Sequence, residues 1–330
     1  MARVTLKGLW QVLKEAGGGF GRHKILKLAA ALAYYTIFSI GPMIIVIIFL
    51  GDFFYGREAI EGTVYNQIKG LVGPNAAEQV QDIIKNASVS DKGGLTAVIG
   101  FVTLLIGATT VFADIQDSIN FIWRLKNKPS AGWLKMLLNR LLSFSIVVSL
   151  GFILLVSLVI NGLLEMLMDR LQRVFPDLTV VVVYVMNLVI TFAVVSCLFA
   201  IIFKVLPDAV IRWKDVIVGA MATAVLFMLG KFAISFYIGT SDVGSTYGTA
   251  GSLVVIVLWV YYAAIILYFG AEFTRAYAAK YGTRIHPNHY AMWMRQVEIP
   301  DGDASLKKQV HTEKKDEIKQ EQEEKKQDNE

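Results

Sequence analysis

The chain has 330 residues, of which 55% are hydrophobic, and a formal net charge of +5 at pH 7. Soluble domains are usually about 45–50% apolar, and here the excess is gathered in long blocks between short charged segments, which excludes an ordinary soluble protein and indicates a helical membrane protein. The single cysteine, Cys197, excludes an intramolecular disulfide and a cysteine-based metal site.

Six stretches each contain the roughly 20 residues that an apolar helix needs to cross about 30 Å of hydrocarbon. Helices are favoured, because backbone groups in lipid must find their hydrogen-bond partners within the protein. The expected spans are residues 25–53, 95–121, 138–164, 180–205, 216–238 and 250–277. The sequence therefore predicts an all-α polytopic membrane protein, a bundle of six transmembrane helices within residues 25–285.

The orientation follows from the Lys and Arg residues of the connecting segments, which are enriched on the cytoplasmic side. Basic residues gather before the first span, in residues 124–140 and 204–214, and after the last span. The connection at residues 239–249 has none, and Arg170 and Arg173 are offset by acidic neighbours. Both termini are therefore expected in the cytoplasm.

Three segments flank or connect the spans. Residues 1–24 are predicted to form a cytoplasmic helix at the membrane interface, with packing on the protein's own loops as the alternative. The first extracytoplasmic connection, residues 54–94, is predicted to be an amphipathic helical segment. Residues 286–330 are expected to be a charged, disordered cytoplasmic tail. The apolar residues at helical spacing in the N-terminal segment are Leu6, Leu9, Trp10 and Leu13.

No motif in the sequence carries catalytic chemistry. His286 and His289 lie on either side of Pro287, without the i, i+4 spacing or the third ligand that a metal site needs. The stretch GTSDVGST, residues 239–246, has its glycines at P-loop spacing but places Ser245 where the phosphate-binding lysine would stand. We therefore expect no metal, no cofactor and no enzymatic activity.

Four blocks of sequence resemble the YihY/BrkB family of bacterial inner-membrane proteins. They are KLAAALAYYTIFSIGPMIIVI, ATTVFADIQDSINFIW, GAMATAVLFMLGKFAISFYI and STYGTAGSLVVIVLWVYYAAIILYFGAEFTRAY. The resemblance implies six helices, cytoplasmic termini and an inner (plasma) membrane location, and transport or lipid translocation is the usual conjecture for the family. Many members carry the name ribonuclease BN, a label regarded as a misassignment, and the lack of a catalytic set here disfavours nuclease activity.

Polar residues within the spans are the candidate functional residues, because an ionisable group at the centre of a transmembrane helix costs about 2.5–3.5 kcal/mol on insertion scales. Lys231 either faces a polar cavity and attracts an anion, or snorkels to the interface or pairs with Glu165. The first span is expected to kink at Pro42, for packing or to line a path. The substrate-path candidates are Lys231, Tyr34, Tyr35, Ser39, Pro42, Tyr237, Tyr247, Trp259 and Tyr262. Aromatic packing is the alternative for Trp259 and Tyr262.

Acidic residues form a second candidate set. Asp114 and Asp117 share a helix face, which suits proton or cation coupling, and pairing with a basic residue of the inner surface is the alternative. Glu272 is expected to pair locally with Arg275. The coupling or ion-pair candidates are Asp114, Asp117, Glu165 and Glu272.

The sequence thus favours a transporter or flippase for an anionic lipid or small solute. The alternative is a non-transporting membrane scaffold that recruits envelope partners. Membrane lipids, including anionic ones, are the expected partners, and the positive-inside bias explains the basic excess without nucleic acid. Protein partners are not identified, and a homo-oligomer is left open.

Overall fold

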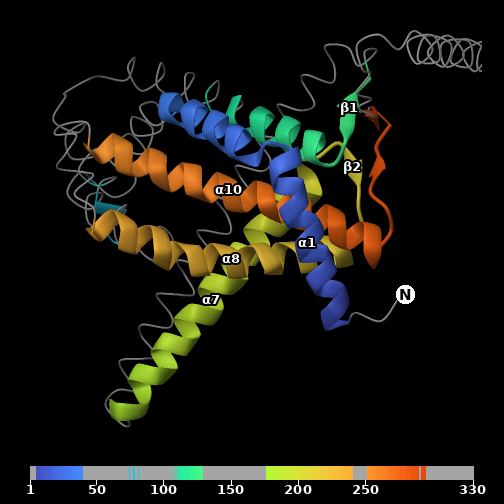
Figure 1. Ribbon diagram of the computed structural model, residues 1–330. Coiled ribbons are helices and arrows are strands. Elements are labelled where there is room, and N and C mark those ends of the chain that lie inside the picture. The colour runs from blue at the N-terminus through green and yellow to red at the C-terminus, as the bar shows by residue number, and fades with distance from the viewer. Residues whose placement is uncertain are drawn as a thin grey trace, which may run out of the picture. The chain divides into compact units, whose positions relative to one another are not determined.

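The computed structural model describes residues 5–39, 74, 77, 78, 81, 107, 110–128, 176–240, 251–289 and 291–294. The described part is mainly helical (Figure 1). Its labelled helices are α1 (Leu6–Arg22), α7 (Pro176–Val205), α8 (Trp213–Thr240) and α10 (Gly251–Lys280). Two further helices cover Ile25–Ser39 and residues 110–122. The strands are β1 (Leu125–Asn127), β2 (Ala209–Val210), β3 (His286–Pro287) and β4 (Ala291–Trp293).

Three of the described helices are long and apolar enough to cross a membrane. They are Val185–Val205, Trp213–Ile238 and Leu253–Lys280, and they coincide with the last three expected spans. The shorter apolar helix Ile25–Ser39 lies within the first expected span. A helical membrane protein is therefore confirmed. The six-span topology and the extracytoplasmic segment stay predictions, since residues 138–164 and most of residues 54–94 lie outside the described residues.

The α8–α10 contact is built on two reciprocal pairs of a glycine and a threonine. A Cβ atom at Gly219 would collide with the Thr274 side chain, and one at Gly270 would collide with that of Thr223. Each threonine hydroxyl donates a 2.7 Å hydrogen bond back along its own helix, Thr223 to Gly219 and Thr274 to Gly270. Small residues let helix backbones approach closely in membranes, where association depends on packing rather than on excluding water.

Helix α1 packs along the last three turns of α10. It begins at Thr5, whose side-chain oxygen accepts a hydrogen bond from the Gly8 N–H at 3.2 Å, an ordinary N-cap. Val12 and Ala16 are buried against α10. Trp10, by contrast, is 67% exposed. Helix α1 therefore packs on the protein through Val12 and Ala16 and exposes the Trp10 ring on another side.

Four short strands lie in the segments that follow or connect the helices. β1 pairs antiparallel with β4, and β2 pairs antiparallel with β3. The residues from His286 to Trp293 therefore belong to the folded unit, which extends to Trp293, although the sequence assigned them to the tail. Strands of two or three residues are too short to show the alternation by which a strand is recognised in a sequence.

Candidate functional site

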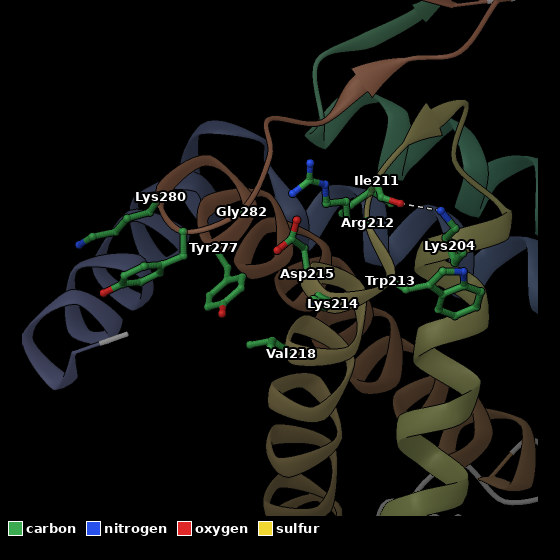
Figure 2. A pocket seen from close by; sticks show the side chains of 11 residues that line it. Lys204, Ile211, Arg212, Trp213, Lys214, Asp215, Val218, Tyr277, Lys280 and Gly282 are labelled. Atoms are coloured by element: carbon green, nitrogen blue, oxygen red, sulfur yellow. Dashed lines mark hydrogen bonds between the residues drawn. The ribbon is translucent and has the colours of Figure 1, made fainter. Parts of the chain in front are cut away.

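A cavity of about 910 Å³ lies where α7 ends, α8 begins and α10 ends (Figure 2). A single carboxylate, that of Asp215, lines it among an excess of cations. The basic lining residues are Lys204, Arg212, Lys214 and Lys280. The aromatic lining residues are Trp213, Tyr277 and Tyr281. The cavity therefore combines positive charge with aromatic rings at the ends of apolar helices.

The connection between α7 and α8 forms one wall of the cavity. The Lys204 ammonium donates a 2.5 Å hydrogen bond to the carbonyl of Ile211 and lies 5.6 Å from the centroid of the Trp213 ring. The Lys204 side chain thus links the end of α7 to the residues at the start of α8. Arg212 and Lys214, at the start of α8, are exposed.

Asp215 occupies the first turn of α8 and is only 5% exposed. A carboxylate is favourable there, because the unpaired N–H groups at a helix N-terminus carry partial positive charge. One carboxylate oxygen accepts from the Thr283 N–H at 3.4 Å. Residue 282 must be glycine in this arrangement, since a Cβ atom there would collide with the same carboxylate. The chain after α10 is thereby held against the start of α8.

Lys280 forms the wall on the α10 side, and its ammonium points toward α1 and away from Asp215 (Figure 2). It donates to the carbonyl oxygen of Gly8 at 3.1 Å and to Oε1 of Gln11. The hydroxyl end of Tyr281 lies so close to Gly8 that a Cβ atom on residue 8 would overlap it. The last turn of α10 therefore contacts both the cavity and α1.

These side chains suit the binding of an anion. Guanidinium and ammonium groups bind phosphates and carboxylates, and aromatic rings are enriched at the membrane–water interface. In the described part of the chain, no group of three His, Cys, Asp or Glu residues is placed to hold a metal ion. In the sequence, Lys204, Arg212 and Lys214 indicate orientation, and Arg212 is one of the basic residues that could pair with the acidic pair Asp114 and Asp117; nothing in the sequence brings them beside Lys280.

Glu272 is the most deeply buried carboxylate of the described residues, at 0% exposure. The expected local pair with Arg275 is present, with 2.6 Å between Nη2 and Oε1. The second partner is His23, whose Nδ1 lies 3.0 Å from Oε2. Residue 19 must be glycine because the Glu272 side chain occupies the space of a Cβ atom. Sequence reasoning missed His23, which lies 249 residues away from Glu272 in the chain.

The structure describes both residues of the acidic pair on helix 110–122, and their coupling or ion-pair role stays a prediction. Asp114 accepts a hydrogen bond from the Tyr268 hydroxyl at 3.4 Å, and Asp117 is exposed. A buried carboxylate that was not predicted, that of Asp208, accepts from the side-chain amides of Asn120 at 2.9 Å and Gln116 at 3.1 Å. These bonds join the α7–α8 connection to helix 110–122 and have the character of a structural network.

The residues around Lys231 form an aromatic cluster. Lys231 is half-buried on α8, and the neighbouring Gly230 lies against the Tyr262 ring. Tyr262 donates a 2.9 Å hydrogen bond to the carbonyl of Phe227, and the Trp259 ring lies 5.7 Å from that of Phe227. Trp259 and Tyr262 therefore pack against Phe227, and whether they also line a path stays a prediction.

The other path candidates lie on the surface or outside the described residues. Tyr34, Tyr35 and Tyr237 are exposed, and the Ser39 hydroxyl bonds back to the carbonyl of Tyr35 at 3.4 Å. Three candidates lie outside the described residues, and their placement stays a prediction: Pro42, Tyr247 and Glu165. The candidate site that the described structure assembles is therefore the basic cavity.

Comparison with known proteins places the chain among bacterial membrane proteins. The sequence profile described as Virulence factor BrkB matches residues 16–292. A UPF0761 membrane protein of Vibrio vulnificus is 25% identical over 92% of this chain and 94% of its own length. One from Stenotrophomonas maltophilia is 26% identical over 78% of this chain and 58% of its own, and one from Haemophilus influenzae 24% identical over 77% and 90%. No solved structure matches.

Proposed function

This chain belongs to the virulence factor BrkB family, and on that premise we propose that it is a multi-pass inner-membrane transporter or flippase, not an enzyme, that accepts an anionic lipid or small solute in the basic cavity. The observation that carries the proposal is the lining itself, four basic side chains and one buried carboxylate at the ends of apolar helices. With both termini in the cytoplasm, as the positive-inside rule favours, the cavity opens toward the cytoplasmic leaflet.

The proposal is tested with purified protein in liposomes that contain a fluorescent phosphatidylglycerol, whose movement between leaflets is followed by chemical quenching of the outer leaflet. Arg212→Gln combined with Lys214→Gln removes two exposed cations of the cavity and is expected to abolish most of the movement. Lys126→Gln removes an exposed cation of β1 that does not line the cavity and is the matched control. In the wild type and in Lys126→Gln, a zwitterionic fluorescent lipid is expected to move more slowly than the phosphatidylglycerol.

Background movement of both lipids in the wild type would refute the flippase function. The same liposomes, loaded with a labelled phosphate ester, then test the solute arm by exchange across the membrane. If neither lipid nor solute moves, the chain does not transport these anions, and the scaffold alternative remains.

A further inference from the structure

We infer that an anion in the basic cavity competes with helix α1 for the Lys280 ammonium, so that filling the cavity loosens the N-terminal half of α1. The inference rests on the proposed anion site and adds a regulation to it. It starts from one residue that serves two places: Lys280 lines the cavity, and its ammonium is bonded to Gly8 and Gln11 of α1.

The exchange is favourable because the two acceptors on α1 are neutral. An ammonium has three donors and no acceptor, and here it donates to a backbone carbonyl and to a side-chain amide oxygen. A phosphate or carboxylate oxygen forms a charge-assisted hydrogen bond, roughly twice as strong as a neutral one. The flexible lysine stem lets the ammonium turn from α1 to the cavity without movement of the α10 backbone.

The lost bonds matter because α1 has a weak segment between its two anchored parts. Val12 and Ala16 pack on α10 at one side of this segment, and His23 is bonded to Glu272 at the other. Between them, Gly17 and Gly21 have no neighbour within 4 Å of a Cβ position, and Gly18 meets only the end of its own helix's Arg22. Packing therefore does not require these glycines, and glycine is the poorest helix former after proline.

The segment of glycines gives α1 a place to bend while the His23 end stays in place. The N-terminal half then depends on Val12, Ala16, the Glu15–Arg275 ion pair and the Lys280 bonds, together with the contact of Tyr281 against Gly8. Tyr281 also lines the cavity, so a ligand there touches both Lys280 and Tyr281, the two side chains that contact the start of α1.

Coupling of this kind is reciprocal in free energy. An anion that draws Lys280 away weakens the hold on α1, and weakening the hold on α1 must strengthen binding of the anion by the same factor. Gln11→Ala removes one competitor for the ammonium and is therefore expected to tighten anion binding. A residue with a merely structural role would not produce a gain of affinity.

The test uses the full chain in nanodiscs of zwitterionic lipid, with inorganic phosphate as the probe and chloride at matched ionic strength. Binding is measured by titration calorimetry, and the hold on α1 by hydrogen–deuterium exchange of the amides of residues 8–16. In the wild type, saturating phosphate is expected to speed this exchange about tenfold, since two ordinary hydrogen bonds are lost. Gln11→Ala is expected to bind phosphate about threefold more tightly, in line with one such bond.

Two further variants separate the coupling from the site. Lys280→Gln is expected to exchange rapidly in α1 with or without phosphate. Arg212→Gln with Lys214→Gln is expected to keep slow exchange and to lose the phosphate response. Lys7→Gln, an exposed cation of α1 outside the cavity lining, is the control and is expected to behave as the wild type.

The outcomes are distinguishable. Saturable phosphate binding with unchanged exchange in α1, or with no gain in Gln11→Ala, overturns the coupling and leaves the anion site standing. No saturable phosphate binding in the wild type overturns the anion site, and the coupling falls with it. Faster exchange together with tighter binding in Gln11→Ala supports both.

Discussion

Gly270→Ala is expected to destabilise the protein, although alanine is the better helix former. The new Cβ atom would overlap the Thr223 side chain, with 2.6 Å to its Cγ2 and 2.9 Å to its Cβ, and would come closer still to the hydroxyl. Thr223 is fully buried, and its hydroxyl is bonded to the Gly219 carbonyl at 2.7 Å. The side chain therefore has no free direction in which to turn, and either that bond or the helix spacing must give way.

The expected cost follows from these contacts. Overpacking by one methyl group costs about 1–3 kcal/mol, and loss of the hydroxyl bond adds about 1 kcal/mol, so we expect a loss of about 2–4 kcal/mol in the free energy of unfolding. Gly17→Ala is the matched control on α1, because its Cβ atom would have no neighbour within 4 Å. It is expected to stabilise by up to about 1 kcal/mol, the difference in helix propensity between the two residues.

The free energy of unfolding is measured by titration with sodium dodecyl sulfate in mixed micelles, followed by near-ultraviolet circular dichroism. Thr223→Ala is then combined with Gly270→Ala, since removing the threonine side chain also removes most of the overlap. The double variant is expected to be more stable than the sum of the single effects by at least about 1 kcal/mol. Equal effects of Gly270→Ala and Gly17→Ala, or strictly additive losses, would refute close approach as the basis of the α8–α10 contact.

Three further predictions use the same measurement. Glu272→Gln is expected to cost about 3 kcal/mol, because it leaves the partly buried Arg275 guanidinium without its carboxylate. Glu15→Gln, on the exposed side of the same network, is expected to cost at most about 1 kcal/mol, and equal losses would contradict the burial argument. Asn120→Ala is expected to cost about 2–3 kcal/mol in the free energy of unfolding, since the Asn120 amide both donates to the buried Asp208 carboxylate and accepts from the Asp208 N–H. A neutral effect would mean that another group replaces the amide in both bonds. Trp123→Phe removes the 2.9 Å bond to the Ala271 carbonyl and is expected to cost about 1 kcal/mol, with no change taken as evidence against that bond.

The long helices could be predicted from the sequence because hydropathy alone determines them. The expected spans at residues 180–205, 216–238 and 250–277 differ by four residues or fewer at each end from α7, α8 and α10. Glycine and threonine at the helix contact gave no such signal, since an isolated glycine in an apolar run has the same hydropathy whether it faces lipid or another helix. The partner of each glycine is set by helix packing, which a single sequence does not show.

The site could not be predicted, because its residues come from three separate segments. Lys204 and Lys214 were recognised as basic residues of a connection, and their grouping with Lys280 depends on how α7, α8 and α10 converge. The same holds for His23 and Glu272, which meet only when α1 lies along α10. Lys231 stood out in the sequence because it is a charge within an apolar run, whereas basic residues at helix ends are ordinary and were used as evidence for orientation.

The arrangement of the contacts limits how the proposed transporter can move. Close approaches join α8 and α10 at Gly219, Gly270 and Gly230, from beside the cavity to the aromatic cluster near Lys231. By helix rise, Gly219 and Gly230 lie about 17 Å apart along α8, so these contacts extend over about half of the hydrocarbon thickness. Two helices in contact at three such points behave as one rigid pair, because closely packed side chains do not deform continuously. Among the labelled helices of the described part, α7 packs on α8 and α1 packs on α10, so opening of the cavity is expected to involve movement of α7 or α1 against this pair. Of these two, α1 carries Gly17 and Gly18, which have no packing neighbour on another helix, and the bonds to Lys280, which makes it the element that an anion in the cavity can displace at the lowest cost.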